Sequence, residues 1–264
     1  MTSALETVHT ALITGASSGI GRAFAQLLAG MGKDLILVAR REDRLQTLAA
    51  ELTRQYPIHS HVLPVDLGRL DGPGRLFADT EARGLTVDLL VNAAGFARVG
   101  EFSELPWETQ GAMIQVNVQA LAELTRLYLP GMRQRHQGGV INVASSAAFQ
   151  PVPYMAVYAA TKAFVLSFSE AIAQEVAEDG VTVLALCPGA TATEFWSIAG
   201  HWQDRLAAMQ SPDRVAAVAL RAFKRRRSSV IPGLQNKVMA FAASRLSPRP
   251  VAARLAARII RGKQ

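Results

Sequence analysis

The sequence predicts an α/β protein built on a doubly wound parallel sheet with helices on both faces. Short apolar runs alternate with segments whose apolar residues recur at helical spacing. Glycine or polar residues follow the ends of several apolar runs, where open α/β sheets bind their ligands. With 264 residues, half of them hydrophobic, the chain is long enough for a single large domain with a substantial core.

The first strand, 10–14, is followed directly by a glycine-rich turn and then by a helix over 22–31. In this arrangement, backbone amides and the positive end of the helix can hold a pyrophosphate. The spacing G-x-x-x-G-x-G differs from the familiar dinucleotide fingerprint, but its place between a strand and a helix favours a phosphate site over a plain connecting turn. The residues expected at the phosphates are Gly15, Ser17, Ser18, Gly19, Ile20 and Gly21.

The second strand, 34–39, ends in Arg40 and Arg41, about where an NAD enzyme would place a carboxylate against the ribose 2′-hydroxyl. A guanidinium there would bind a 2′-phosphate through charge-assisted hydrogen bonds, which indicates NADP. In the alternative interpretation, both arginines belong to the solvated face of the following helix, 42–55.

The alternation continues to the end of the sheet. We expect further strands over 58–65, 87–91, 139–144, 181–187 and 229–232, and helices over 73–83, 107–135, 154–179 and 211–227. Residues 191–194 look like a capping box before a short helix that runs through Gln210.

Residues that follow the later strands are candidates for cofactor contacts. Asp66, with Leu67, could accept a hydrogen bond from an adenine, and the compact segment 92–95 could let a cofactor pass. For both, a helix cap or a turn is the alternative. Thr191 and Thr193 could reach a nicotinamide carboxamide. The remaining candidates of this group are Asn92, Ala93, Ala94, Gly95, Pro188 and Gly189.

Tyr158 and Lys162 stand four residues apart in the predicted helix 154–179, so both side chains lie on one face. A neighbouring ammonium favours the phenolate, which should lower the pKa of Tyr158 and make it useful as an acid or base. Alone the pair is a weak signal, since tyrosine often packs in a core while lysine reaches for water. Ser145, at the end of the strand 139–144, supplies a third polar group.

Charge is distributed unevenly along the chain. Residues 1–213 carry 15 basic and 21 acidic side chains, whereas residues 214–264 carry 13 basic side chains and no acidic one. Residues 250–261 form a predicted basic amphipathic helix that could lie on an anionic membrane surface or attract an acyl-CoA. The alternative is a helix docked on its own fold or on a partner subunit.

Other classes of protein receive less support from the sequence. The first nine residues do not resemble a secretory signal, and no uncharged apolar run reaches the length of a membrane-spanning helix, so we expect a cytoplasmic protein, with the basic tail offering a peripheral contact at the inner membrane surface. One cysteine and five scattered histidines predict no metal site. Despite the basic tail, no nucleic-acid-binding motif is recognisable, and no nucleic acid partner is expected.

Together these motifs resemble the short-chain dehydrogenase/reductase family over residues 1–235, which leaves 236–264 as a basic helical extension. The matching pieces are Thr14-Gly15-x-x-x-Gly19-x-Gly21, Asn92-x-Ala94-Gly95, Asn117, Ser145, Tyr158-x-x-x-Lys162 and Pro188-Gly189. Ala93 is a departure, because the family often has a second asparagine there. The stretch of sequence around Arg40 and the basic carboxyl terminus are similar to the bacterial branch of the family that is related to 17β-hydroxysteroid and 3-oxoacyl reductases.

The resemblance implies a Rossmann-type sheet of about seven strands, a homo-oligomer (dimer or tetramer) and NADP(H)-dependent interconversion of a ketone and a secondary alcohol. It casts Tyr158 as proton donor, Lys162 as holder of the ribose, Ser145 as partner of the carbonyl and Asn117 as holder of a relay water; Tyr158 and Lys162 would both also contact the cofactor. A non-catalytic NADP(H) sensor or scaffold is the alternative. Apolar residues in loops beyond the strand ends suggest a lipid-like, steroid-like or 3-oxoacyl substrate; they are Phe96, Val99, Phe102, Tyr154, Met155, Phe195 and Trp196.

Overall fold

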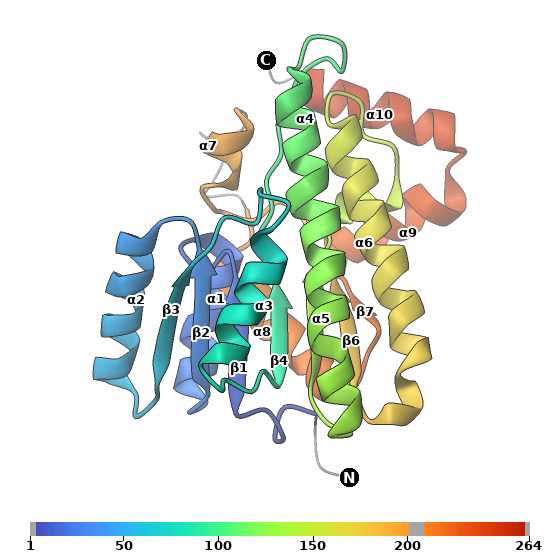
Figure 1. Cartoon of the computed structure of the whole chain (residues 1–264). Helices are drawn as coiled ribbons and strands as arrows, with labels where there is room; N and C mark the ends of the chain where they lie inside the picture. The colour runs from blue at the N-terminus through green and yellow to red at the C-terminus, as the bar shows by residue number, and fades with distance from the viewer. Residues whose placement is uncertain (1–3, 201–208, 262–264) are drawn as a thin grey trace.

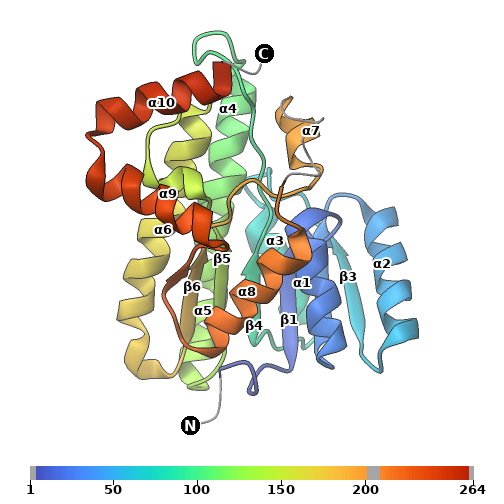
Figure 2. The same cartoon turned by 180° about the vertical axis from the view of Figure 1, so that it is seen from behind.

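The protein, seen here in a computed structural model, is built on one parallel sheet with helices packed on both faces (Figures 1 and 2). The structure describes residues 4–200 and 209–261. The strands are β1 (Thr10–Thr14), β2 (Asp34–Ala39), β3 (Ser60–Pro64), β4 (Leu89–Asn92), β5 (Gly139–Val143), β6 (Thr182–Leu186) and β7 (Ser229–Val230).

The helices fall between the strands, with two more after the last one. They are α1 (Gly19–Gly30), α2 (Glu42–Gln55), α3 (Gly72–Ala82), α4 (Trp107–Ile114), α5 (Leu121–Gln134), α6 (Ala156–Glu175), α7 (Phe195–Ala199), α8 (Pro212–Lys224), α9 (Leu234–Phe241) and α10 (Arg249–Arg261). Short 3₁₀ turns occupy Ser146–Phe149 and Ala177–Asp179, and π-helical turns occupy Gln115–Ala120 and Ala242–Leu246.

The sheet has seven strands in the order β3-β2-β1-β4-β5-β6-β7, all parallel. After β3, at one edge, the chain returns to the middle and places β4 beside β1. This reversal makes a crevice beyond the carboxyl ends of β1 and β4, where doubly wound sheets bind ligands. The predicted parallel sheet of about seven strands is therefore confirmed.

Alternating residues along each strand feed two apolar layers, because successive side chains of a strand point to opposite faces. In β1, Ile13 packs with residues of α1, α2 and α8, while Leu12 packs with α3 and α5. Both side chains are fully buried, as are most residues of the central strands. Helices thus cover each face completely enough for the strands to be apolar runs, as the sequence indicated.

The predicted helix over 107–135 differs from the structure, since the π-helical turn Gln115–Ala120 separates α4 from α5. The last strand has two residues instead of the four predicted over 229–232. The helix expected to run through Gln210 ends at Ala199 as α7, and residues 201–208 of that prediction lie outside the described residues.

One described helix, α6, is long and apolar enough to cross a membrane by length and composition alone. Its buried side chains pack on the sheet. Val165 lies in an apolar cluster with Ala144, which follows β5, and with Ala185 of β6. A helix that is an integral part of the core passes the same length test as a spanning one.

Helices α9 and α10 form a hairpin beyond the carboxyl edge of the sheet (Figure 2). Ile260 of α10 belongs to the same apolar cluster as Met155 and Tyr158. The extension therefore packs against the part of the chain that carries the candidate catalytic residues. Of the two sequence-based interpretations of the tail, contact with its own fold holds for the buried side of α10, formed by Ala252, Ala256 and Ile260.

Candidate active site

A large cavity of about 1610 Å³ lies at the carboxyl ends of the strands, over the reversal of strand order. Nearly all of the residues that the sequence singled out line this cavity. Its lining extends from the glycine-rich turn to α10. The predicted residues that line it are Gly15, Ser17, Ser18, Gly19, Ile20, Gly21, Arg40, Arg41, Asp66, Leu67, Ala93, Ala94, Gly95, Ser145, Tyr158, Lys162, Pro188, Gly189, Thr191 and Thr193.

The glycines of the glycine-rich turn stand at positions with little or no room for a side chain. Gly15 and Gly19 have positive φ angles, 68° and 55°, a conformation that favours glycine. A Cβ on Gly21 would stand 2.4 Å from the carbonyl oxygen of Gly15. The N-cap of α1, Ser18, makes no capping hydrogen bond through its side chain, so the helix begins with its amides directed at the cavity. A ligand carrying negative charge is the natural partner of such a helix end.

Arg41 reaches across the turn and bonds to both of its serines. Its guanidinium donates to Ser17 Oγ at 3.0 Å and to Ser18 Oγ at 3.1 Å. It also pairs with Glu194, with 2.9 Å between Nη1 and Oε2, while Arg44 pairs with the other carboxylate oxygen at 2.6 Å. The two arginines lower the pKa of Glu194 through these hydrogen bonds.

The ion pair of Glu194 with Arg44 was missed from sequence, because 150 residues separate the two and the sequence assigned Glu194 only to a capping box. The predicted capping box at 191–194 is wrong, because the structure does not show its side-chain bonds. Glu194 is the N-cap residue of α7 but makes no side-chain capping bond, and Thr193 Oγ1 accepts the amide of Phe195 instead. Glu194 therefore ties α7 to the arginines at the glycine-rich turn.

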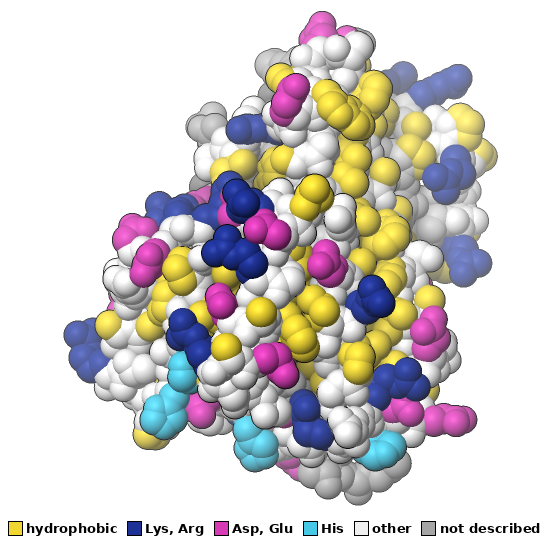
Figure 3. Space-filling view, viewed as in Figure 1, with side chains coloured by type: hydrophobic (Ala, Val, Ile, Leu, Met, Phe, Trp, Pro, Cys, Tyr) yellow, Lys and Arg dark blue, Asp and Glu magenta, His cyan; other side chains and the backbone are white. Residues whose placement is uncertain are grey.

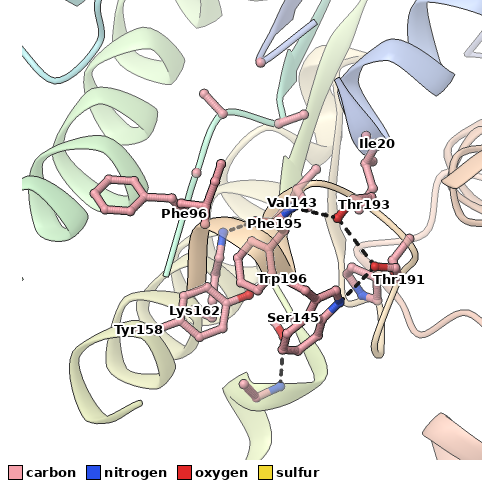
Figure 4. Close-up of a pocket in the computed structure, with 18 of the residues that line it drawn as sticks. Ile20, Phe96, Val143, Ser145, Tyr158, Lys162, Thr191, Thr193, Phe195 and Trp196 are labelled. Carbon is pink, nitrogen blue, oxygen red and sulfur yellow. Dashed lines mark hydrogen bonds between the residues drawn. The ribbon is translucent and has the colours of Figure 1, made fainter. Parts of the chain in front are cut away.

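Ser145, Tyr158 and Lys162 come together on one wall of the cavity (Figure 4). Tyr158 and Lys162 occupy the first two turns of α6, and Ser145 lies two residues after the end of β5. The Lys162 amine lies 5.8 Å from the centre of the Tyr158 ring and donates to the carbonyl of Val143 at 2.7 Å. The Ser145 hydroxyl, which also accepts the amide of Ala147, lies near enough to the Tyr158 phenol to act on its pKa.

The expectation that Lys162 lowers the pKa of Tyr158 is not met. Burial raises the pKa of Tyr158 to about 12, and the hydrogen bond from Ser145 opposes this rise only in part. Burial also lowers the pKa of Lys162 to about 8. Desolvation disfavours the charged form of each group, and it is the largest cause of both shifts. At neutral pH the site holds a protonated phenol beside an ammonium.

Asn117 does not line the cavity but lies behind its wall, fully buried in the π-helical turn. Its amide binds the backbone of Phe96 on both sides, accepting from N at 3.1 Å and donating to O at 3.0 Å. A further hydrogen bond runs to Thr161 Oγ1 at 3.2 Å. The side chain thus fixes the loop after β4, with its amide nitrogen donating twice and its oxygen accepting once.

Asn92, predicted to contact the cofactor, is directed away from the cavity and into the sheet. Its amide donates to Asn142 Oδ1 at 2.9 Å and to Thr125 Oγ1 at 3.3 Å. Alternation along β4 puts Asn92 on the face covered by α5, since Leu90 lies on that face as well. Asp66 does line the cavity, with one carboxylate oxygen accepting the amide of Gly68 in a local turn.

Thr14 of β1 holds the segment after β4, a role that the sequence did not suggest. Its hydroxyl accepts the amides of Ala93 and Ala94, at 3.0 and 3.1 Å. A Cβ on Gly15 would come within 3.0 Å of Ala94 Cα, so the two loops that flank the crevice are packed closely.

The side of the cavity away from the glycine-rich turn is apolar. Four of the seven predicted loop residues line it, namely Phe96, Met155, Phe195 and Trp196, and the extension adds Met239, Ile259 and Ile260. Tyr158 and Phe195 are in ring contact at 5.4 Å. Phe102 does not line the cavity and is 61% exposed, while Val99 and Tyr154 pack behind the wall.

In the described part of the chain, no group of three or more His, Cys, Asp or Glu side chains is placed to hold a metal ion. Cys187, at the end of β6, is a free and buried thiol. Burial raises its pKa to about 12, so it is a neutral neighbour of Lys162.

Fold and site together define a doubly wound α/β protein with a dinucleotide-sized crevice at its strand-order reversal. The description "short chain dehydrogenase" belongs to the family model that matches residues 9–204. The chain is 36% identical to a very-long-chain 3-oxoacyl-CoA reductase of Anas platyrhynchos over 71% of its own length and 61% of that protein's. It is 33% identical to a 7beta-hydroxysteroid dehydrogenase of Mediterraneibacter gnavus over 86% of both chains.

Solved structures agree with these relatives. A short-chain dehydrogenase from Sphingobium yanoikuyae in complex with NADPH superposes with a TM-score of 0.82 at 35% identity, covering 90% of this chain and 94% of that one. A 7beta-hydroxysteroid dehydrogenase superposes with a TM-score of 0.87 at 28% identity, covering 96% and 99%.

The protein belongs to the short-chain dehydrogenase family, as its motifs predicted. The chain spans between 52% and 61% of the length of the first curated relatives it matches.

Proposed function

We propose that this protein is an NADP(H)-dependent oxidoreductase that interconverts a ketone and a secondary alcohol on an apolar substrate. The observation that carries the proposal is the meeting of Ser145, Tyr158 and Lys162 between a glycine-rich turn and an apolar wall, all in one cavity. Relatives named as 3-oxoacyl-CoA reductase and hydroxysteroid dehydrogenase support the substrate class, since acyl chains and steroids are both apolar bodies with an oxygen to be reduced or oxidised.

The residues present fit a dinucleotide. The glycine-rich turn offers unobstructed amides for a pyrophosphate, because a Cβ at Gly21 would clash with the turn itself. Arg41, bonded to the serines of that turn, is placed for the 2′-phosphate of NADP. The complex of a relative with NADPH supports the same choice.

In this proposal the bound cofactor supplies or accepts the hydride, and the protein handles the proton. Tyr158, protonated at neutral pH because its pKa is about 12, donates its proton to the carbonyl oxygen of the substrate. Ser145 donates a second hydrogen bond to the same oxygen, which favours the charge that develops there. Lys162, an ammonium at pH 7, holds the ribose and stabilises the phenolate that Tyr158 becomes.

The test compares Tyr158→Phe with the unchanged protein. Consumption of NADPH is measured against a panel of cyclic ketones and 3-oxoacyl thioesters, and NADPH binding is measured by fluorescence titration. We expect turnover to fall by about 10²- to 10⁴-fold, the usual value of a positioned proton donor, with NADPH affinity within about twofold. Activity that survives the substitution would remove Tyr158 from the reaction.

The alternative, a non-catalytic NADP(H) sensor, predicts a different pattern. NADPH would bind, and no ketone or thioester would be reduced in either protein. The buried lysine argues against this role, because a mere binding protein has no evident use for an amine held at a desolvation cost next to a phenol.

Assembly into a homo-oligomer is part of the proposal. Hydrophobic side chains gather over the face formed by α5 and α6 (Figure 3), and Phe164 and Phe168 stack there at 5.5 Å. Phe164 is exposed in the single chain. Contiguous apolar surface of this kind marks interfaces. Light scattering coupled to size exclusion would detect the dimer or tetramer, and Phe164→Asp should shift it toward the monomer. The proposal places the reaction in the cytoplasm, where a free thiol such as Cys187 stays reduced.

A further inference from the structure

The hairpin of α9 and α10 carries a second exposed apolar surface, separate from the face of α5 and α6. We call it the hairpin face and define it by five exposed side chains, Val238, Phe241, Leu246, Val251 and Leu255. Their exposures run from 43% for Val251 to 70% for Leu246. Single exposed apolar residues need no explanation, but a group on two adjacent helices does.

Helix α10 has three distinct sides rather than the two of an ordinary surface helix. Ala252, Ala256 and Ile260 are buried against the rest of the protein. Val251, Leu255 and Ile259 follow at the next positions around the helix and are exposed, each 43–51%. Arginines complete the circle beyond them, so the apolar exposed stripe lies between the packed side and a basic side.

The charged residues of the hairpin itself have one sign. Lys237, Arg245, Arg249, Arg254 and Arg258 are all exposed, and no acidic residue occurs from 214 to 264. Figure 3 shows basic side chains beside hydrophobic ones at the end of the molecule formed by α9 and α10. An apolar stripe flanked by arginines is the arrangement of helices that lie in the plane of a bilayer interface, with their basic groups at anionic headgroups.

The hairpin face also adjoins the entrance of the active-site cavity. Met239 and Ile259 are each about half exposed, and both line the cavity. They connect the outer surface of the hairpin to the apolar wall at Phe195 and Trp196. A molecule dissolved in the acyl region of a bilayer would therefore meet a continuous apolar path to Tyr158 if the hairpin lay on that bilayer.

We propose that the hairpin face binds the surface of an anionic phospholipid bilayer, and that apolar substrate enters the cavity from the lipid. The second half of this statement rests on the proposed oxidoreductase function, and the first half does not. Two copies of the chain are a poorer occupant, because a two-fold interface through this face would bring the same arginines of both copies together without an acidic partner.

The experiment measures cosedimentation of the full chain with vesicles, without cofactor or substrate. Vesicles of phosphatidylcholine are compared with vesicles of 70% phosphatidylcholine and 30% phosphatidylglycerol. We expect binding to the anionic vesicles, weaker binding to the neutral ones, and a decrease when the salt is raised from about 0.05 to about 0.5 M, because screening shortens the reach of the arginines.

Two double variants separate the apolar and the basic contribution. Val251→Asp with Leu255→Asp, and Arg254→Glu with Arg258→Glu, should each reduce partition at least about tenfold. None of these residues lines the cavity, so NADPH binding and turnover of a water-soluble ketone should stay unchanged. The matched controls are Leu70→Asp, at a residue 71% exposed beside α3, and Arg54→Glu with Arg83→Glu, at exposed residues of α2 and the end of α3. These controls should bind vesicles normally.

Several outcomes would overturn the proposal. They are absence of binding to anionic vesicles, an equal loss in the control variants, or full binding by the aspartate variant of α10. A change of oligomeric state in that variant, with no change in vesicle partition, would identify the hairpin face as an interface between copies. Because vesicle binding is measured without substrate, its failure leaves the oxidoreductase proposal standing, and failure of ketone reduction leaves membrane binding standing.

Discussion

Lys162 keeps its amine in a place that costs stability. It is 5% exposed, and it donates to the carbonyl of Val143. Its pKa falls from 10.5 to about 8, and at about 1.4 kcal/mol for each pKa unit this corresponds to roughly 3 kcal/mol of unfavourable charge burial at neutral pH. Proteins retain such a group where it is needed for a reaction or a ligand.

This cost should be visible in the pH dependence of stability. Below pH 8, Lys162 is charged in both the folded and the unfolded chain, and the cost is complete. Between pH 8 and 10.5 the unfolded chain binds more protons at this site, so the lysine contribution makes the free energy of unfolding rise with pH. Urea titrations between pH 8 and 10.5 measure this free energy of unfolding. It should rise with pH more steeply in the unchanged protein than in Lys162→Met.

The comparison with Lys162→Met removes the opposing effects of other groups. Tyr158 and Cys187 have raised pKa values in the folded state, so their contributions make stability fall at high pH in both proteins. At pH 7 we expect Lys162→Met to be at least as stable as the unchanged protein, since an apolar chain of similar size replaces a desolvated charge. A variant destabilised by several kcal/mol at pH 7 would contradict this account.

Ser145 and Ser146 offer a direct test of which serine serves the reaction. Both serines line the cavity, and Ser145 is the one that acts on the pKa of Tyr158. We expect Ser145→Ala to lower kcat/KM by about 10²- to 10³-fold, the usual loss for one oxyanion donor. Ser146→Ala, which removes the same atom one residue along, should stay within about threefold. Equal losses would mean that the two hydroxyls share the role.

At the scale of elements, the pairing of Glu194 with Arg41 and Arg44 joins the short helix α7 to the helix α2. The carboxylate is partly exposed and engages the same guanidinium that the proposed function assigns to a 2′-phosphate. A phosphate arriving there must share Arg41 with Glu194 or replace it, and a negative neighbour weakens its binding.

Glu194→Gln should therefore tighten NADPH binding by about three- to tenfold and leave NADH nearly unchanged, as judged by titration of both cofactors. Glu51→Gln is a matched control, because Glu51 pairs with Arg22 at 3.1 Å and has nearly the same exposure, 43% against 42%. Weaker NADPH binding in Glu194→Gln would show instead that the carboxylate holds Arg41 in position for the phosphate.

The sequence predicted elements well where apolar periodicity is regular, and poorly where packing decides. Strands were placed within two residues of their observed limits in the centre of the sheet, since buried parallel strands are nearly continuous apolar runs. The π-helical turn at Gln115–Ala120 has no such signal, because one extra residue in a turn leaves the apolar spacing on either side almost unchanged.

The candidate site residues were likewise predicted well where a motif exists and poorly where packing decides. Motif residues such as Ser145, Tyr158 and Lys162 were found because their spacing carries chemistry, and the structure brings them together. The rise in the Tyr158 pKa was not foreseen, because burial is a property of the whole fold. Asn92 was misplaced although alternation along β4 could have indicated its direction.

At the scale of the whole molecule, the carboxyl-terminal extension forms part of the wall of a cavity that is otherwise lined by the strand ends and their loops. The glycine-rich turn and Arg41, which the proposed function assigns to the cofactor phosphates, come from the first part of the chain, and Met239, Ile259 and Ile260 come from the last part. Deleting residues 236–264 should therefore lower kcat/KM for bulky apolar ketones by at least about tenfold, while NADPH affinity changes little. Loss of NADPH binding, with a collapse of thermal stability, would show that the two predicted parts fold only together.

Tyr158 and Lys162 lie in the first turns of α6, a helix that packs on the sheet. Part of the cavity wall near them is formed by the hairpin of α9 and α10, which comes last in the sequence. The proposed proton donor and this part of the apolar wall thus belong to separate stretches of the chain. Exchange of residues 236–264 between relatives should therefore change which ketones are accepted while leaving the proposed proton transfer in place.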